Sequence, residues 1–316
     1  MLLDRARADS VLNLVGNTPL IKVDLFEREF PGLEVYAKAE WFNPGGSVKD
    51  RAALAMIEAG EREGLLGPGR ILIDSTSGNT GIAYAMVGAA KGHPVTLVMP
   101  DNVNEERKQV VTAYGAEIVY SDGMEGSDGA IRLCREIVAR DPGRYFYPDQ
   151  YSNPANPLAH YDGTAIEILE QTGGRVTHFV AGLGTTGTFT GTARRLKEHD
   201  ASIGAFAVQP DDAFHGLEGL KHLPTSIVPA VWDPSLADEV FWAPTEASYD
   251  LARALARRGL LVGHSSGAAL WGVKKLAQRI REGVVVTIFP DGGDRYLSTG
   301  LYRLGGRGTG RAQGRR

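Results

Sequence analysis

The sequence predicts an α/β protein with open, mostly parallel sheets flanked by helices. From about residue 33 onward, apolar runs rich in β-branched residues alternate with helical patterns. Several of these runs are short, continuously apolar and end in Gly, Pro, Asp or Ser, as expected for strands buried on both faces. Such alternation along a chain is typical of parallel sheets with helices packed on them.

The elements follow in order along the chain. The expected strands are Leu33–Ala39, Ile71–Asp74, Val95–Met99, Ile118–Tyr120, Val176–Ala181, Ala205–Val208 and Val284–Phe289. The expected helices are Asp50–Glu63, Thr80–Lys91, Glu105–Tyr114, Asp128–Arg140, Tyr161–Gln171, Thr188–Glu198, Thr245–Arg257 and Ala268–Arg281. Gly92 and Gly115 are expected to end the helices that precede them.

The length of 316 residues suits one large or two medium domains. We predict a boundary in the polar, proline-broken segment Asp149–Pro157. An N-terminal α/β domain would then cover residues 40–148, and a C-terminal α/β domain would combine residues 1–39 with 149–304. Gly and Arg dominate residues 305–316, and this composition predicts a disordered basic tail.

Composition excludes several classes of protein. The formal net charge of −4 argues against a nucleic-acid-binding surface. The single cysteine, Cys134, rules out a disulfide within the chain and fits a reducing compartment. The first ten residues do not form a signal peptide and no run is long enough to span a membrane, so we expect a cytoplasmic protein without a membrane partner.

The segment Asn43–Arg51 follows an expected strand and opens a helix. Its two glycines let the backbone approach a ligand, and Ser47 is placed to cap the helix. Lys49 then lies in the first helical turn, where the partial positive charge of the helix favours its neutral amine. A neutral lysine is what imine-forming chemistry requires. The alternative for Lys49 is a solvated lysine on an amphipathic helix.

Two further loops join a strand to a helix and are suited to anions. Ser75–Gly81 offers hydroxyls and backbone N–H groups at a helix start, which suit a carboxylate. Gly182–Thr188 has the glycines and threonines of a phosphate cradle. The alternatives are a polar capping turn for the first loop and an ordinary glycine-rich loop for the second. Gly182–Thr188 lacks the dinucleotide pattern with its downstream acid, and the chain has no Gly-Lys-Ser/Thr phosphate loop.

Two other segments are candidates of lower specificity. Gly263–Gly267 contains two serines and leads into a helix. Asp291–Tyr296 follows the last expected strand, where it either closes a site or only ends the sheet.

Taken together and in this order, these segments resemble the cysteine synthase family of fold-type II pyridoxal-phosphate enzymes. The resemblance rests on Asn-Pro-Gly-Gly-Ser-Val-Lys-Asp-Arg, Thr-Ser-Gly-Asn-Thr-Gly and Gly-Thr-Thr-Gly-Thr, and it includes Gly16–Leu20 and Arg295–Thr299. The double threonine and the segment Gly219–Pro224 are similar to B-type cysteine synthases in particular. The family implies a tryptophan-synthase-β-like fold of two sheets, with the cofactor between the two domains.

The resemblance assigns roles to individual residues. Lys49 would hold pyridoxal phosphate as an internal aldimine, and Asn79 would hydrogen-bond the oxygen on the cofactor ring. Ser265 would face the pyridine nitrogen, with Ser266 as the alternative one position further on. The phosphate would be bound by Gly184, Thr185, Thr186, Gly187 and Thr188. The substrate carboxylate would be taken by the segment that contains Thr76, Ser77, Gly78 and Thr80, together with Gln150. No metal is implied.

The activity implied is β-replacement that makes L-cysteine. An activated serine (O-acetylserine or O-phosphoserine) displaces Lys49 from the cofactor, and the freed amine removes the Cα proton. The leaving group departs to give an α-aminoacrylate, and sulfide or another sulfur donor then adds to Cβ. A serine at the ring nitrogen makes the ring a weaker electron sink than an aspartate would, which favours prompt elimination.

Lys221 departs from the family pattern, because B-type members often carry arginine in this segment. A cation there could recognise a phosphate leaving group or an anionic sulfur donor such as thiosulfate, but Lys and Arg differ in forked contacts with oxyanions. The hypothesis is that Lys221 helps to select the leaving group. The alternative is a solvated lysine on a mobile loop.

Rival functions exist inside and outside the family. The nearest are a cystathionine β-synthase and a serine/threonine dehydratase of the same fold. A nucleotide-binding α/β protein would use Gly182–Thr188 for a dinucleotide, but the missing acid and the presence of Lys49 count against it. The resemblance also implies a homodimer and admits serine acetyltransferase as a protein partner.

Overall fold

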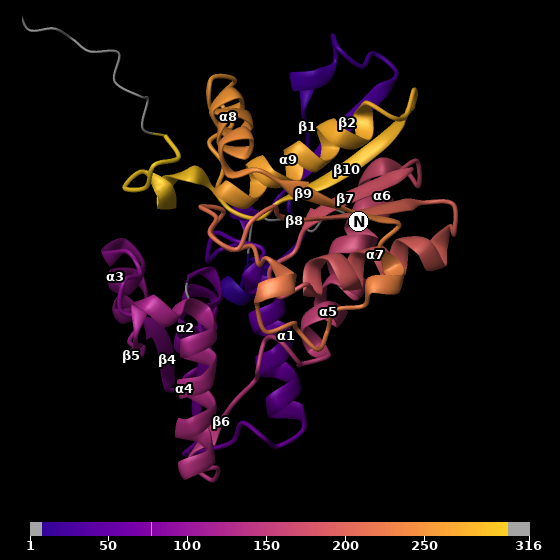
Figure 1. Cartoon of the computed structure of the whole chain (residues 1–316). Coiled ribbons are helices and arrows are strands. Elements are labelled where there is room, and N and C mark those ends of the chain that lie inside the picture. Colours follow the sequence, from indigo (N-terminus) through magenta and orange to yellow (C-terminus); the bar gives the residue numbers. More distant parts are fainter. Residues whose placement is uncertain (1–7, 77, 303–316) are drawn as a thin grey trace, which may run out of the picture.

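The computed structural model describes residues 8–76 and 78–302 and contains two sheets with helices packed on them (Figure 1). The larger sheet consists, in spatial order, of β1 (Leu20–Lys22), β2 (Leu33–Ala39), β10 (Gly283–Phe289), β7 (His178–Gly182), β8 (Gly204–Pro210) and β9 (Glu239–Ala243). The smaller sheet consists of β5 (Glu117–Ser121), β4 (Val95–Pro100), β3 (Ile71–Ser75) and β6 (Tyr145–Phe146). Among the described strands only the β1–β2 pair is antiparallel. The predicted fold class is confirmed.

The helices alternate with these strands. They are α1 (Lys49–Arg62), α2 (Asn79–Lys91), α3 (Glu105–Ala113), α4 (Gly126–Arg140), α5 (Ala155–Ala159), α6 (Ala165–Thr172), α7 (Gly187–His199), α8 (Thr245–Ala256) and α9 (His264–Ala277). Gly92 has a φ of 78° and ends α2, as predicted, because a left-handed residue stops a helix and suits glycine. Gly115 is also left-handed, directly after the turn that ends α3.

Several predicted elements are wrong in extent. The helix expected at Tyr161–Gln171 is instead α5, a π-helical turn at His160–Thr164 and α6, so it begins earlier and is interrupted. Helix α9 begins at His264, four residues before the expected start, and places both serines of Gly263–Gly267 in its first turn. The predictions missed β1, β6 and β9, which lie at sheet edges.

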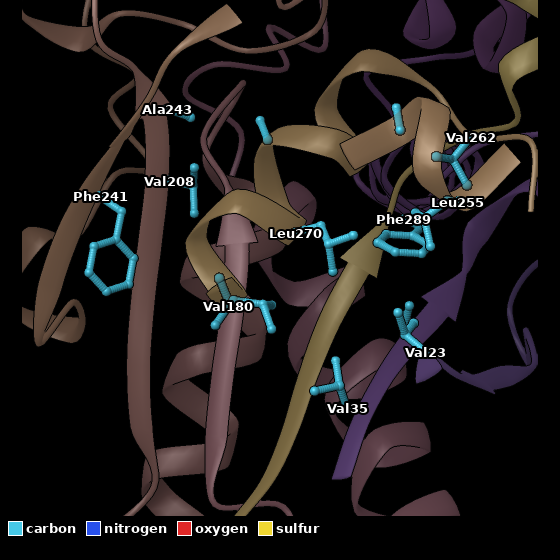
Figure 2. Close-up of a cluster of buried hydrophobic side chains, with 14 of the residues drawn as sticks. Val23, Val35, Val180, Val208, Phe241, Ala243, Leu255, Val262, Leu270 and Phe289 are labelled. Atoms are coloured by element: carbon cyan, nitrogen blue, oxygen red, sulfur yellow. The ribbon is translucent and has the colours of Figure 1, made fainter. Parts of the chain in front are cut away.

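The larger sheet is buried on both faces, as continuously apolar strands predict. Val180, Val208 and Val285 pack on one side with residues of α8 and α9 (Figure 2). Their neighbours Phe179 and Val286 face the other side and pack with residues of α6 and α7. Successive residues of a strand point to opposite faces, so each apolar strand serves two cores.

The smaller sheet has the same layered construction. Leu72 and Leu97 pack with residues of α1 and α2, whereas Ile73 and Val98 pack with Ala130 and Cys134 of α4. Cys134 is therefore a buried apolar residue, and burial raises the pKa of its thiol. Within the described residues, no helix has the length and apolar character needed to cross a membrane.

Candidate active site

Two adjoining cavities lie where the loops after β3 and β7 meet the start of α1. The larger has a volume of about 520 Å³ and the smaller about 40 Å³. They share lining residues, which are Lys49, Asn79, Gly184, Thr185, Gly219, Leu220 and Tyr296. Segments that are far apart in the sequence, and that were predicted separately as ligand-binding loops, therefore border the same two cavities. This is the carboxyl-end position expected for ligands in parallel α/β sheets.

Lys49 is the first residue of α1 and lines both cavities. Burial lowers the pKa of its amine, although the negative charges of Asp291 and Glu40 oppose the shift. The expected cap is one position off, because Val48 is the N-cap, but the Ser47 hydroxyl still accepts a hydrogen bond from Lys49 N at 3.2 Å. The amine is therefore held at a helix start in an environment that favours its neutral, nucleophilic form.

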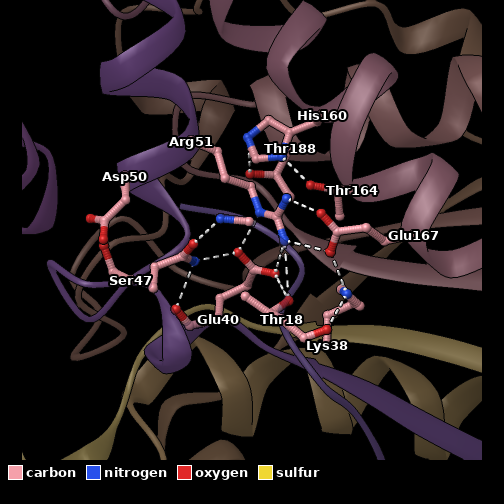
Figure 3. A network of polar contacts seen from close by, with 12 residues as sticks. Thr18, Lys38, Glu40, Ser47, Asp50, Arg51, His160, Thr164, Glu167 and Thr188 are labelled. Atoms are coloured by element: carbon pink, nitrogen blue, oxygen red, sulfur yellow. Dashed lines mark hydrogen bonds and ion pairs between the residues drawn. The ribbon is translucent and has the colours of Figure 1, made fainter. Parts of the chain in front are cut away.

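A buried ionic network holds α1 against the larger sheet (Figure 3). The guanidinium of Arg51, two residues after Lys49, donates to Glu40 at 2.7 and 2.9 Å and to Glu167 at 2.6 and 2.8 Å. Lys38 on β2 also donates to Glu167, at 2.6 Å, and to the Thr18 carbonyl at 2.7 Å. Two cations and two carboxylates balance in the interior, so the start of α1 has a fixed position.

The Thr76–Thr80 segment borders the larger cavity, where Thr76, Gly78 and Thr80 line the wall. The Thr76 hydroxyl accepts from Gly78 N at 3.1 Å and from Gly81 N at 3.0 Å, so it shapes the start of α2. Thr80 donates to the side chain of Gln150 at 2.8 Å, and Gln150 also lines this cavity. The predicted substrate residues therefore lie together, except Ser77, which is outside the described residues.

The predicted phosphate loop borders the smaller cavity, which Gly184, Thr185, Thr186 and Thr188 line. Gly187 begins α7 directly beside them. Thr186 has a φ of 69°, a left-handed conformation that is costly for a threonine and is found mainly at functional sites. Its hydroxyl is buried without a hydrogen-bond partner among the described residues. A ligand that accepts hydrogen bonds would satisfy it.

The two candidate serines differ in their surroundings. Ser265 lines the smaller cavity. Ser266 is fully buried, does not line either cavity, and its hydroxyl has no hydrogen-bond partner within the described part of the chain. A ligand in the cavity would therefore meet Ser265.

Lys221 lines the larger cavity and is only 7% exposed. Its amine donates to Asp128 at 2.9 Å and to Ser127 at 3.4 Å, and it lies 5.1 Å from the ring centre of Tyr151. The alternative of a solvated lysine is therefore wrong. The ammonium faces the cavity region with its charge partly balanced by Asp128.

Asp291–Tyr296 closes the site, which decides between the two interpretations of this segment. Asn79 donates to Asp291 at 2.6 Å and accepts from Arg295 at 2.6 Å, so both ends of its amide are fixed. Tyr296 donates to Asp291 at 2.5 Å and lines both cavities. Burial raises the pKa of Asp291, against the hydrogen bonds from Tyr296 and Asn79. Two sequence signals pointed to this segment: its position after a buried strand and the resemblance of Arg295–Thr299 to the family pattern.

The sequence did not single out Arg107 on α3. Its guanidinium pairs with Glu218 at 2.8 Å and lies 5.3 Å from the ring centre of Tyr296. Arg107 and Glu218 both line the larger cavity. An ion pair thus joins α3, beside the smaller sheet, to the segment that carries Lys221.

Helices α1, α2, α7 and α9 all begin at these cavities, because Lys49, Asn79, Thr188 and Ser265 lie in their first turns and line the walls. Helix starts carry partial positive charge and unpaired N–H groups. Their convergence makes the region suited to anions, with α2 and α7 beside the predicted carboxylate and phosphate loops.

Comparisons with known proteins agree with this geometry. Residues 11–291 match the family described as pyridoxal-phosphate dependent enzyme, and the chain belongs to this family. It is 51% identical over 305 residues to a cysteine synthase of Aquifex aeolicus, covering 94% of this chain and 93% of that one. It is 45% identical to cysteine synthase B of Escherichia coli, with 91% and 94% covered. The crystal structure of a cysteine synthase from Entamoeba histolytica superposes with a TM-score of 0.91 at 35% identity, covering 97% of this chain and 94% of that chain.

The protein is therefore a pyridoxal-phosphate enzyme, and the interpretation as a dinucleotide-binding protein is wrong. The residues present fit this cofactor. An amine with a lowered pKa, a loop with an unsatisfied buried hydroxyl at the start of α7, and the hydroxyl of Ser265 line one pair of cavities. The amine suits the aldehyde of the cofactor, the loop suits its phosphate, and the serine hydroxyl suits its pyridine nitrogen.

Proposed function

We propose that this enzyme makes L-cysteine from an activated serine and sulfide or another sulfur donor. The observation that carries the proposal is the lysine amine at the start of α1, which shares its cavities with a carboxylate loop and a phosphate loop. The sequence similarity to cysteine synthases over more than nine tenths of the chain supports it.

In this proposal Lys49, Asn79, Ser265 and the loop Gly184–Thr188 hold pyridoxal phosphate. Thr76, Ser77, Gly78, Thr80 and Gln150 take the carboxylate of the amino acid. When bound, the cofactor supplies an electron sink for the bonds at Cα of the substrate. The hydroxyls and N–H groups at the start of α2 orient the carboxylate, and the fixed amide of Asn79 orients the cofactor ring.

Lys49 also moves the proton in this proposal. A neutral amine can take a proton from Cα and return it later, and burial lowers the pKa of the Lys49 amine, which favours this neutral form. The buried network around Arg51 keeps α1, and thus this amine, in place while the leaving group departs and the sulfur donor adds.

The activity is tested by supplying O-acetylserine with either sulfide or homocysteine and identifying the product. We expect L-cysteine with sulfide and little thioether with homocysteine. Cystathionine as the main product would favour a cystathionine β-synthase, and pyruvate without any sulfur product would favour a dehydratase.

Ser265→Asp should slow elimination by at least about tenfold, which corresponds to 1.4 kcal/mol in the barrier. An aspartate at the ring nitrogen would favour its protonation and a longer-lived carbanion. Stopped-flow absorbance after addition of O-acetylserine measures the step. Ser266→Ala is the matched control and should leave it unchanged. If only the Ser266 variant slows elimination, the assignment of Ser265 is wrong.

Lys221→Ala should lower kcat/KM for O-phosphoserine by about tenfold and leave kcat/KM for O-acetylserine nearly unchanged. The reason is the loss of one charge-assisted hydrogen bond to a dianionic leaving group. Steady-state kinetics with both substrates give the ratio. Equal effects on the two substrates would dismiss a role of Lys221 in this selection.

Several broader predictions remain part of the proposal. Two domains, of residues 40–148 and of residues 1–39 with 149–304, are supported by the strand membership of the two sheets. A homodimer, a contact with serine acetyltransferase and a cytoplasmic location rest on the family resemblance and on the composition. Light scattering of the purified protein, alone and with the acetyltransferase, tests the first two of these three.

A further inference from the structure

Asn156 is a buried polar residue between the two loops of the site. It lies on α5 and is 1% exposed. Its side-chain nitrogen donates to the carbonyl of Gln150 at 2.7 Å and to the hydroxyl of Thr185 at 3.1 Å. One amide therefore contacts both a predicted substrate residue and a predicted phosphate residue.

The orientation of this amide follows from its partners. A backbone carbonyl can only accept, so the nitrogen, and not the oxygen, of the Asn156 amide must face Gln150. The same nitrogen then supplies its second hydrogen to Thr185, whose oxygen must act as acceptor. The amide orientation is thus set by a group that cannot change its role.

This arrangement determines what the Thr185 hydroxyl can do. Because its oxygen accepts from Asn156, its own hydrogen is left to point elsewhere, and Thr185 lines both cavities. The Thr185 hydroxyl can therefore donate a hydrogen bond to an anion in the cavities. A carboxylate at position 156 would reverse this role, since it would accept the hydrogen of Thr185.

The other side of Asn156 packs on the start of α7. A Cβ atom on Gly187 would lie 2.1 Å from Asn156 Oδ1, so glycine is required for the amide to fit. Gln150, in turn, donates from its side chain to the Ser75 carbonyl at 2.7 Å and accepts from Thr80 at 2.8 Å. A continuous chain of hydrogen bonds thus joins the loop after β3 to the loop after β7.

We propose that Asn156 is a positioning residue for the phosphate loop, and that its amide holds the Thr185 hydroxyl as a donor toward the cofactor phosphate. The inference rests on the proposed role of Gly184–Thr188. Asn156 touches neither substrate nor the reacting atoms in this proposal and acts through Thr185. If Asn156 only supported α5, its effect on cofactor binding would not depend on the Thr185 hydroxyl.

A double-mutant cycle separates these roles. The variants are Asn156→Ala, Thr185→Val and the double variant, and the measurement is the rate at which each holoenzyme loses pyridoxal phosphate during dialysis, followed by visible absorbance. We expect each single variant to lose the cofactor about tenfold faster than the wild type, as for one hydrogen bond to a charged group. The double variant should lose it no faster than Thr185→Val alone, because the two residues act as a unit.

Leu158→Ala is the control, since Leu158 lies on α5 with Asn156, is 48% exposed and lines neither cavity. It should release the cofactor at the wild-type rate. Multiplicative effects in the double variant, or a wild-type rate for Asn156→Ala, would overturn the inference. If Asn156→Ala does not fold, Asn156→Ser takes its place in the cycle. Wild-type protein that binds no pyridoxal phosphate would instead overturn the proposed function itself.

Discussion

Lys49→Ala is expected to abolish the visible absorption of the cofactor and to lower the turnover of O-acetylserine by at least about 10⁴-fold. The change removes both the covalent link to the cofactor and the general base, and a positioned base alone contributes about 10²- to 10⁴-fold. Absorbance of the purified protein and a sulfide-dependent assay of cysteine measure the two effects. Borohydride reduction of the wild type should place the cofactor mass on the peptide that contains Lys49.

Lys91→Ala provides the control, because Lys91 ends α2 and pairs with Glu61 on α1, away from the cavities. It should keep the absorption and the turnover of the wild type. If Lys49→Ala retains either property, or if reduction labels another lysine, the proposed chemistry is wrong. Lys49 makes no ion pair among the described residues, so its replacement removes none of the ionic contacts that hold α1.

The central strands could be predicted because most of their positions are buried and apolar, although β2 also carries Glu34 and the buried Lys38. β2 was predicted with its full extent, and β10 within one residue, since each packs in two cores. β1, β6 and β9 lie at the edges of the sheets. β1 and β6 have only three and two residues, too few to form a pattern, whereas β9 (Glu-Val-Phe-Trp-Ala) has a composition that favours a strand and was overlooked.

At the site the starts of α1, α2 and α7 were predicted within one residue, whereas the start of α9 was predicted four residues too late. Helix α9 begins inside the Gly-His-Ser-Ser-Gly segment, whose residues favour turns when they are considered locally. The structure instead buries His264 between the rings of Tyr249 and Tyr296, with ring centres 5.0 and 4.4 Å away. Tertiary packing therefore decides where this helix starts, and no local pattern contains that information.

The site residues that the sequence revealed are those in contiguous post-strand loops, such as Lys49, Asn79 and Thr185. Asn156, Arg107 and Asp291 were not assigned a role, because each acts through a partner distant in the sequence. Asp291, for example, contacts Asn79 across 212 positions of the chain. Patterns of residue type and spacing predict loops, whereas contacts between loops depend on how the two sheets are placed.

Glu167→Gln is expected to lower the free energy of unfolding by about 3 kcal/mol at pH 7, because it leaves Arg51 and Lys38 buried with one carboxylate too few. The variant has nearly the size and shape of the wild-type side chain, so the loss reports on charge and not on a cavity. Urea unfolding of the holoenzyme measures it. Glu34→Gln is the matched control, since Glu34 forms an exposed ion pair with Arg175, and it should change stability little.

The pH dependence distinguishes loss of charge from loss of packing. Burial raises the pKa of Glu167, but the hydrogen bonds and charge of Arg51, with Lys38, outweigh burial and hold that pKa well below its ordinary value. A carboxylate with a lowered pKa stabilises the fold above its unfolded-state pKa, about 4.3 for glutamate, and this contribution is lost as the pH falls toward the folded-state value. The difference between wild type and Glu167→Gln should therefore be constant from about pH 6 to 8 and narrow below about pH 4. A difference that stays the same in acid would mean that the glutamine disturbs packing, and the ionic account of how α1 holds Lys49 would be wrong.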